Sequence, residues 1–395
     1  MRGHSDRAHA KLSASGSARW LACPGSVRLE EQFPDRTSEY AEEGTAAHEL
    51  AELMLRHKLH EIAEEDYRRH LETFKTGKYY SHEMFECCET YSDIVLERVN
   101  AAKALTADTQ VLLEQRLDFS PWVPGGFGTG DVVIISEASI EVIDFKFGKG
   151  VPVSAWDNSQ MRLYALGAYN TYGYIFGPEI VTMTIIQPRL DNISEDIITI
   201  DELLDWAENT VKPRAEEALS DDGELRAGEH CKFCKAKAVC KTRADANLAL
   251  AKYEFQDPEL LTVEEIGEVL AQADELKAWV SDVEKYALDQ AYNHGLTIPG
   301  WKLVEGRSVR RFKDPDAVAK VLLSQGYNSE EIYKRDLKGI TDLQKMLGKK
   351  KFESLLSDYI IKPPGKPKLA MESDSRPEIS TAAIAAEEFK NIKGD

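Results

Sequence analysis

The sequence predicts an α/β fold in which helices flank a mixed sheet, and three observations support that fold class. The chain has 395 residues, of which 43% are hydrophobic and 30% charged, so a large core can form and global disorder is excluded. Apolar residues recur at helical spacing before residue 105, whereas short β-rich runs follow between 111 and 147. Helical and strand patterns then continue to alternate, as in an α/β layer.

The expected elements begin with an irregular arm at residues 1–38 and continue into a core at 39–244. The arm contains a short helical turn around Ala18–Leu21, and Ser26 is a candidate N-cap for another short helix. Asp201 is a candidate N-cap for the last helix of the core. In chain order the core is expected to contain helices at 39–58 and 81–105, strands at 111–117, 131–135 and 140–147, a helix at 157–171, a strand at 180–188 and a helix at 201–219.

A C-terminal α+β extension is expected after the core. Its residues 245–362 are mainly helical by pattern, and the tail at 363–395 opens with Pro-Pro-Gly-Lys-Pro and is expected to be extended. The elements expected in this extension are a helical stretch reaching Asn293, a strand pair at 301–305 and 308–312, and helices at 314–325 and 340–358.

Composition and charge exclude several classes of protein. A net charge of −19 argues against a surface that coats nucleic acid non-specifically, although a local basic channel would suffice for an enzyme. No apolar stretch approaches the roughly 18 residues of a membrane span. The sequence contains no G-x-x-x-x-G-K-[ST] motif. The N-terminal residues lack the apolar segment of a secretory signal, so we expect a cytoplasmic protein without a membrane partner.

The strongest chemical signal is a pair of aspartates with a lysine. Asp131 begins one expected strand, and Asp144-Phe145-Lys146 ends the next. Because side chains alternate along a strand, Asp144 and Lys146 point to the same face, and Asp131 can lie beside them. Carboxylates bind Mg²⁺ or Mn²⁺, and a bound metal with an adjacent amine is what phosphodiester hydrolysis requires. An ordinary surface ion pair is the alternative, since D-x-K alone is a common pattern.

Two further motifs accompany the aspartates. Gly44-Thr45-Ala46-Ala47-His48 lies on the expected helix upstream, and Gln160 and Tyr164 lie one turn apart on the helix that follows the D-x-K strand. Taken alone, His48 would be a structural histidine, and Gln160 with Tyr164 a solvated helix face.

In this order and approximate spacing, G-T-A-x-H, G-D, D-x-K and Q-x-x-x-Y resemble the RecB-like branch of the PD-(D/E)XK nucleases. The resemblance implies a restriction-endonuclease-like core. It also implies that the metal ligands are His48, Asp131, Asp144 and the carbonyl of Phe145, that Lys146 is the catalytic lysine, and that Gln160 and Tyr164 contact DNA. Glu114 matches a weaker acidic position. The chain has Asp144 where many members have glutamate, and both residues occur in the superfamily.

The cysteines give a second signal. Cys231, Cys234 and Cys240 follow a C-x2-C-x5-C pattern, and Cys23 stands alone far upstream. In a reducing compartment such spacing indicates metal or cluster ligation rather than disulfides. Four thiolates suit either zinc or an iron–sulfur cluster, and spacing does not distinguish them.

The cysteine pattern is similar to the iron–sulfur subset of RecB-like nucleases, which includes AddB-type subunits and CRISPR-adaptation nucleases. This resemblance implies that Cys23, Cys231, Cys234 and Cys240 bind a [4Fe–4S] cluster that holds the two ends of the core together. Cys87 and Cys88 lie in a helical stripe, where partly buried thiols are expected.

Nearly the full length also resembles a poorly described family of phage and prophage proteins, through SASGSARWLACPGS, EEGTAAHEL, IDFKFGKG and KPPGKPKLAMESDSRP. That resemblance implies a DNA exonuclease in phage recombination or replication in a bacterial cytoplasm, with an annealing protein, a single-strand-binding protein or a helicase as partner. Two alternatives stay open: a catalytically idle DNA-binding scaffold subunit, and a zinc-stabilised binding module.

Basic stretches fit a channel for DNA. Lys146 and Lys149 flank the D-x-K site, and five basic residues surround the cysteine motif. A third stretch, at 301–313, combines arginines with Trp301 and Phe312, which could stack on bases. A solvated charged face is the alternative for each stretch. The five basic residues around the cysteine motif are Lys232, Lys235, Lys237, Lys241 and Arg243.

Overall fold

The computed structural model of the protein describes residues 10–34, 38–249, 261–302, 315–324, 340, 343–344 and 348–360. The chain divides into two compact units, Met1–Gln290 and Ala291–Asp395. The first unit contains the D-x-K site, its accompanying motifs and the four clustered cysteines, whereas the stretch at 301–313 and the KPPGKPKLAMESDSRP segment belong to the second.

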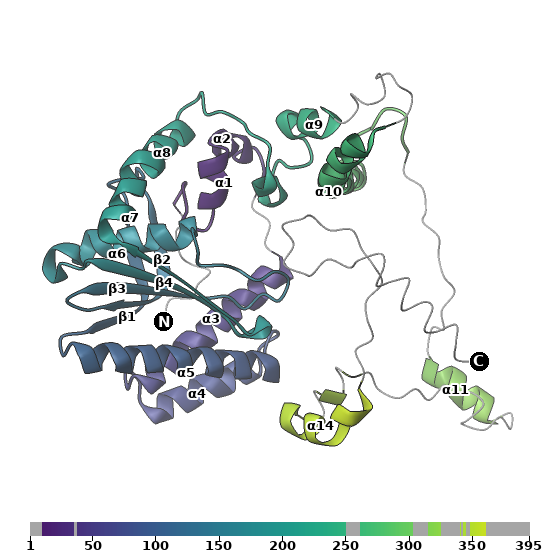
Figure 1. The fold of residues 1–395 in the computed structure, drawn as a ribbon. Helices are drawn as coiled ribbons and strands as arrows, with labels where there is room; N and C mark the ends of the chain where they lie inside the picture. The colour runs from purple at the N-terminus through teal and green to yellow at the C-terminus, as the bar shows by residue number, and fades with distance from the viewer. Residues whose placement is uncertain are drawn as a thin grey trace, which may run out of the picture. The chain divides into compact units, whose positions relative to one another are not determined.

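A five-stranded mixed sheet forms the centre of the first unit (Figure 1). The strands lie in the order in which they occur in the chain, and all neighbours are antiparallel except β3 and β4, which are parallel. The strands are β1 (Gln110–Asp118), β2 (Phe127–Ile135), β3 (Ser139–Phe145), β4 (Ile180–Gln187) and β5 (Asn192–Thr199). The parallel pair requires a crossover, which α6 (Ser159–Phe176) supplies.

Helices cover both faces of the sheet, and each face has its own apolar cluster. On one face, α6 packs with α7 (Ile200–Trp206), α8 (Lys212–Leu219) and the N-terminal segment. On the other, the helices are α3 (Glu39–Lys58), α4 (Glu64–Lys75) and α5 (His82–Leu105). In β3, Val142 belongs to the first cluster and Ile143 to the second, because successive strand side chains point to opposite faces. The expected mixed sheet between helices is confirmed.

Strands β2 and β3 separate at one end of the sheet. Their pairing stops at Val132 and Ile143, whereas β2 stays paired with β1 as far as Phe127. β3 instead continues along β4, where the Lys146 amide donates to the carbonyl of Ile186 at 2.9 Å. We call this divergence the fork, and Asp131 and Asp144 are the first residues inside it.

The N-terminal segment, expected to be an irregular arm, is instead packed into the unit. Trp20 on α1 (Ser17–Ala22) is buried, and its indole donates to the Ser13 carbonyl at 3.0 Å. A second short helix, α2 (Ser26–Glu30), follows, and both helices lie against α8. Its N-cap is Gly25 without a side-chain hydrogen bond, so the expectation of a Ser26 cap is wrong.

Three further differences separate the observed elements from the expected ones. Strand β5 and helix α4 were not expected. The expected helix at 201–219 is interrupted by a π-turn at Ala207–Val211, and Pro213 lies in the first turn of α8. The N-cap of α7 is Thr199 rather than Asp201: its hydroxyl accepts from the Glu202 amide at 3.2 Å.

The cysteine motif follows α8, and two helices follow the motif. Cys231 belongs to the 3-10 turn η4 (Glu229–Phe233), and Cys240 caps α9 (Lys241–Leu248). Helix α10 (Val263–His294) comes next, and buried Arg243 on α9 forms ion pairs with its Glu275 and Asp282 at 2.7 and 2.8 Å.

The described helices of the second unit are α11 (Pro315–Ser324), α14 (Lys349–Leu356) and the turn η6 (Ser357–Tyr359). The expected strand pair falls largely outside the described residues, as does the tail at 363–395. None of the helices in the described part of the chain combines the length and the apolarity needed to cross a membrane.

Candidate metal centre

Asp131 is fixed in the fork by two hydrogen bonds. Its Oδ2 accepts from the Phe145 amide at 2.7 Å, which replaces the ladder hydrogen bond that the diverging strands no longer make. Its Oδ1 lies 3.1 Å from Nδ1 of His48. The side chain thus joins β2, β3 and α3 at one point.

His48 reaches this point from α3, on the face of the sheet covered by α3 and α5. Its ring meets the Phe145 ring edge-on, with centroids 5.3 Å apart. Burial disfavours a charged imidazole, but the carboxylates of Asp131 and Asp144 outweigh that cost and raise the pKa of His48 to about 9. The same interaction lowers the pKa of Asp131, although burial alone would raise it. The pair is therefore a charged imidazolium and carboxylate at neutral pH.

Asp144 and Lys146 point to the opposite face, toward α6. Lys146 Nζ lies 3.0 Å from Asp144 Oδ2 and 3.3 Å from Gln160 Oε1. Gln160 Nε2 in turn lies 3.2 Å from Asp144 Oδ1 and 3.2 Å from the Tyr164 hydroxyl. Side chains that are two apart on β3 and four apart on α6 therefore form one network.

The α6 helix is positioned for this network by its N-terminus and by a glycine. The Asn158 side chain caps α6, accepting from the amides of Gln160 and Met161. A Cβ at Gly128 would lie 2.6 Å from the Tyr164 ring, so only glycine allows β2 to approach that ring so closely.

Charges in the network are shifted by burial. Asp144 is only 4% exposed, and burial raises its pKa despite the nearby ammonium of Lys146. Burial opposes the charge on Lys146, but Asp144 more than compensates and raises the pKa of the lysine. Apart from this ion pair with Lys146, the buried Asp144 Oδ2 has no hydrogen-bond partner among the described residues.

Glu114 joins His48 and Asp131 more closely than the sequence indicated. One ligand atom from each of these three residues lies within 4.8 Å of the other two. Glu114 lies between the paired positions Leu113 and Gln115 of β1, with φ at 52°, a left-handed conformation that is rare for a glutamate. Such local strain is characteristic of functional sites.

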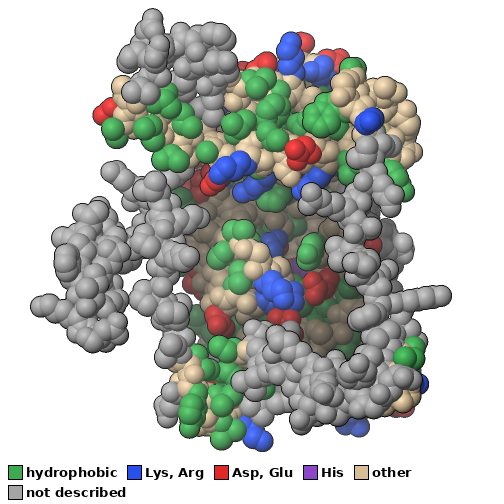
Figure 2. All heavy atoms as spheres, turned by 90° about the vertical axis from the view of Figure 1, so that its right-hand side faces the viewer, with side chains coloured by type: hydrophobic (Ala, Val, Ile, Leu, Met, Phe, Trp, Pro, Cys, Tyr) green, Lys and Arg blue, Asp and Glu red, His purple; other side chains and the backbone are tan. Residues whose placement is uncertain are grey.

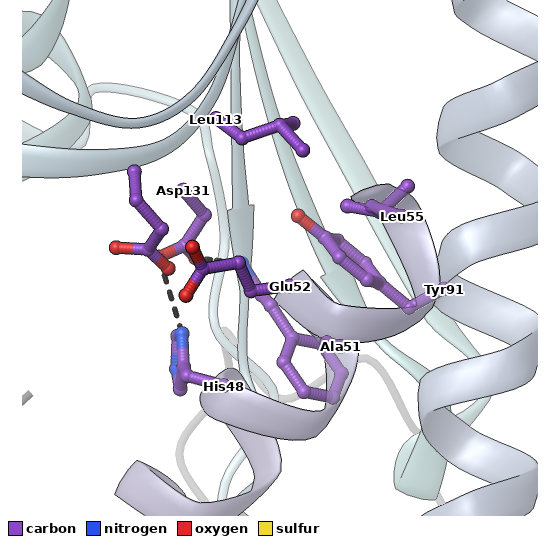
Figure 3. Close-up of a pocket in the computed structure, with 9 residues that line it drawn as sticks. His48, Ala51, Glu52, Leu55, Tyr91, Leu113 and Asp131 are labelled. Atoms are coloured by element: carbon purple, nitrogen blue, oxygen red, sulfur yellow. Dashed lines mark hydrogen bonds and ion pairs between the residues drawn. The ribbon is translucent and has the colours of Figure 1, made fainter. Parts of the chain in front are cut away.

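These groups line a cavity with a volume of about 10 Å³, which is room for roughly one water-sized atom or ion. Figure 3 shows His48, Glu52 and Asp131 pointing toward one another, with the Tyr91 ring directed into the same space. Burial raises the pKa of the Tyr91 hydroxyl, for which the described part of the chain offers no hydrogen-bond partner. Sequence reasoning missed Glu52 and Tyr91. Glu52 could have been found, because it lies one helical turn after His48.

The donor set fits a divalent cation. Carboxylate oxygens and a neutral imidazole are suitable ligands for Mg²⁺ or Mn²⁺, with histidine favouring manganese. The Tyr91 hydroxyl, which lines the cavity, is a buried polar atom that a bound ion or its water could satisfy. Of the ligands expected from the sequence, His48 and Asp131 are in contact and Asp144 is held on the other side of the fork by Lys146 and Gln160. The Phe145 carbonyl stays a predicted ligand.

The four cysteines lie where the two ends of the core meet. The thiols are not in disulfides, and Cys23, Cys231 and Cys234 are buried. Burial raises the pKa of Cys231, and the adjacent thiols of Cys23 and Cys240 contribute to the increase. Cys23 Sγ accepts from the Arg226 amide at 3.3 Å.

The α1–α2 segment is attached to the cysteine motif by more than the cysteines. Glu30 on α2 accepts from the Lys235 amide at 2.8 Å and pairs with Arg19 at 2.7 Å. The Gly25 amide donates to the carbonyl of Glu224 at 3.0 Å. Thiols that are free of disulfides and mostly buried at one place are suited to a metal or an iron–sulfur cluster.

Fold and site together define a mixed α/β protein with a restriction-endonuclease-like core and a carboxylate–imidazole cluster at the fork of its sheet. The model of the family described as "Protein of unknown function (DUF2800)" matches residues 9–377, and the chain belongs to this family.

Two solved structures are similar to this chain. One is a crystal structure of SSO0001, with 16% identity and a TM-score of 0.26 over 60% of this chain and 90% of that one. The other is a protein named a "putative exonuclease" from Eubacterium rectale, with 15% identity and a TM-score of 0.33 over 58% of this chain and 89% of that one.

Proposed function

We propose that the protein is a metal-dependent DNA nuclease that hydrolyses phosphodiester bonds at the fork. The observation that carries the proposal is that two contacting pairs flank the fork, His48 with Asp131 on one side and Asp144 with Lys146 on the other. We refer to these four side chains as the fork site.

His48, Asp131 and Glu114 would hold a Mg²⁺ or Mn²⁺ ion, with Asp144 as a further ligand from β3. When bound, the ion supplies charge neutralisation at the scissile phosphate and a more acidic water. His48 must lose the proton that Asp131 stabilises before its nitrogen can serve as a ligand.

Lys146 has the properties expected of the catalytic lysine. Its pKa is raised, so its amine stays protonated and can stabilise negative charge on phosphate oxygens or orient a water. Asp144 and Gln160 hold that amine on the side of the fork covered by α6, and Gln160 also contacts Tyr164. We infer that Gln160 and Tyr164 border the DNA strand. Acidic, basic and histidine side chains are visible together near the centre of the face in Figure 2.

The test is digestion of linear and circular DNA with Mg²⁺ or Mn²⁺, by the wild type and by Asp144→Asn and Lys146→Ala. We expect each variant to lose activity about 10²–10³-fold, the usual effect of removing one group that stabilises transition-state charge. Lys103→Ala, which changes an exposed lysine on α5, is the matched control and should cleave like the wild type. Loss of linear but not circular DNA would identify an exonuclease.

Two outcomes would contradict the proposal. If both fork variants cleave as fast as the wild type, the activity belongs to another site or to a contaminant. If the wild type binds DNA but cleaves none with either metal, the scaffold alternative is favoured.

We also propose that Cys23, Cys231, Cys234 and Cys240 bind a [4Fe–4S] cluster, as the sequence resemblance implies. Their burial and their proximity across the two ends of the core support ligation, and a cluster would hold those ends together. Metal analysis of anaerobically purified protein is the test. A brown protein containing iron would agree with the proposal, whereas a colourless one containing zinc would replace the cluster with a zinc site.

A biological role follows from the sequence resemblance to phage proteins. We propose that the nuclease resects DNA ends during phage recombination or replication in a bacterial cytoplasm. An annealing protein, a single-strand-binding protein or a helicase would then act on the product strand. Co-purification of tagged protein with each candidate partner, with and without DNA, tests these interactions.

A further inference from the structure

A groove lies between the start of α1 and the turn η4, which carries Cys231 and is followed by Cys234. Its volume is about 370 Å³. One wall comes from the N-terminal segment and the other from the cysteine turn. The lining residues are Ser15, Gly16, Ala18, Arg19, Glu229, His230, Lys232 and Phe233.

A short series of contacts links one wall of this groove to the fork site. The wall residues Ser15 and Gly16 directly precede Ser17, whose hydroxyl lies 2.6 Å from that of Ser159 at the first position of α6. The next residue of α6 is Gln160, which contacts both Asp144 and Lys146. The groove wall is thus connected to the fork through the first residues of α6.

The most unusual side chain of the groove is Phe233. It is 72% exposed, although its ring is apolar, and in sequence it lies between two buried cysteines, Cys231 and Cys234. Lys232 Nζ lies 5.1 Å from the centre of its ring. A rigidly held aromatic ring next to an ammonium group can stack on a nucleobase while the amine binds a phosphate.

The charge around this turn also favours an anionic ligand. Residues 226–243 contain six lysines and arginines and one glutamate, in a chain with a net charge of −19. Arg226, Lys237 and Arg243 are paired with carboxylates. Within the described part of the chain, Lys232 and Lys241 form no ion pair. Such a local excess of positive charge attracts a phosphate backbone.

We propose that this groove binds an unpaired DNA strand on its way to the fork, with Phe233 stacking on a base and Lys232 contacting a phosphate. An unpaired strand is specified because the bases of a duplex are stacked on one another and cannot offer a face to Phe233. The inference rests on the proposed nuclease function, and it identifies the substrate of that site as single-stranded DNA or a frayed end.

Binding in EDTA tests the groove separately from cleavage. Fluorescence anisotropy of a labelled oligothymidylate of about 20 nucleotides would be compared with that of a duplex of equal length. For Phe233→Ala we expect about tenfold weaker binding of the single strand, as for the loss of one stacked base, and a change below about twofold for the duplex. Phe233→Trp should restore binding, because an indole ring stacks as well. Lys232→Ala should weaken binding modestly and lower the salt dependence by about one phosphate contact.

Tyr174→Ala is the matched control, since it removes a fully exposed aromatic ring from the C-terminal turn of α6 and should bind like the wild type. Metal content and melting temperature of each variant check the cysteine turn. If Phe233→Ala disturbs the turn, Phe233→Leu keeps apolar bulk without a stacking ring and should still bind weakly.

The groove and the nuclease can fail independently. Hydrolysis of the p-nitrophenyl ester of thymidine monophosphate with Mn²⁺ needs the fork but not the groove, so Phe233→Ala should retain it. Unchanged single-strand binding by Phe233→Ala and Phe233→Leu would overturn the proposal that the groove binds an unpaired strand, even if the wild type cleaves DNA. Phe233-dependent binding without any hydrolysis would keep the groove and overturn the nuclease.

Discussion

The fork site and the cysteine cluster, Cys23, Cys231, Cys234 and Cys240, are both assembled across the first unit, yet different interactions hold them. At the fork, the backbone of the sheet places the side chains. Asp131 and Asp144 lie on adjacent strands, directly beside the last pair of the β2–β3 ladder, Val132 and Ile143. At the cluster, Cys23 meets residues more than two hundred positions away, through short helices and turns.

Because the two sites are held differently, we expect substitutions in them to affect activity and stability differently. The sheet that supports the fork is covered by apolar clusters on both faces, so the geometry of the site does not depend on its own charged groups. The segment around Cys23 also packs into the unit through Trp20 and Val27, and ligation by the cysteines would add a direct link to residues 231–240. Substitutions at the fork should therefore affect chemistry more than stability, and those at the cluster the reverse.

We expect the largest effect at Asp131, where two variants distinguish the role of its negative charge from the role of its hydrogen bond. Asp131→Asn and Asp131→Ala should both lower nuclease activity about 10²–10³-fold, because each removes a carboxylate ligand. Only Asp131→Ala leaves the Phe145 amide without its acceptor, which should lower the free energy of unfolding by about 1–3 kcal/mol. Nuclease assays and urea denaturation of both variants measure this. Equal stability of the two variants would mean that the Asp131–Phe145 bond does not hold the fork.

The next effect concerns the cluster. Cys23→Ser should remove the bound metal and lower the free energy of unfolding by about 2–5 kcal/mol, as for the loss of a native cross-link over a long loop. Cys87→Ala, which truncates a buried thiol on α5 outside the cluster, is the control and should keep full metal content. Metal analysis and denaturation provide the measurement. A Cys23→Ser protein with unchanged metal content and stability would show that Cys23 is not a ligand.

A smaller effect tests the packing beside the cluster without touching a ligand. A Cβ at Gly25 would lie 2.3 Å from the Gly223 carbonyl oxygen, a backbone atom that cannot easily move away. Gly25→Ala should therefore destabilise the protein by about 1–3 kcal/mol. Gly44→Ala is the control, since its Cβ on α3 would meet nothing within 4 Å and alanine favours the helix. If Gly25→Ala is as stable as Gly44→Ala, the 23–26 segment is not closely packed against residue 223.

Properties that depend on local sequence were predictable. Asp144 and Lys146 share a face because side chains alternate along a strand. Gln160 and Tyr164 share a face because they are one helical turn apart on α6. The capping box of α7 is also visible in the sequence, because Thr199 and Glu202 have the required spacing. The prediction of Asp201 as the N-cap did not take this spacing into account. The N-cap of α7 could therefore have been predicted correctly from the sequence.

Properties that depend on tertiary contacts were not predictable. Where β2 and β3 separate is decided by their other partners, β1 and β4, and no local pattern records it. Glu114 approaches Asp131 with its own backbone in a left-handed conformation, which the sequence around it does not predict. Strand β5 was missed because its apolar positions, including Ile193 and Ile197, are exposed at the sheet edge.

The smallest expected effect compares the cysteines of α5 with an ordinary thiol. Burial, with a further contribution from Glu83, raises the pKa of Cys87 to about 11, and burial raises that of Cys88 further. Because the thiolate is the reactive form, alkylation of Cys87 by iodoacetamide at pH 8 should be about 10²-fold slower than that of an unperturbed thiol. Its rate should still rise about tenfold per pH unit between pH 8 and 10, where an unperturbed thiol levels off. Peptide mass spectrometry of native protein gives both rates. Fast labelling at pH 8 that saturates near pH 9 would mean that α5 opens readily, and that the face of the sheet behind the fork is less rigid than its apolar cluster implies.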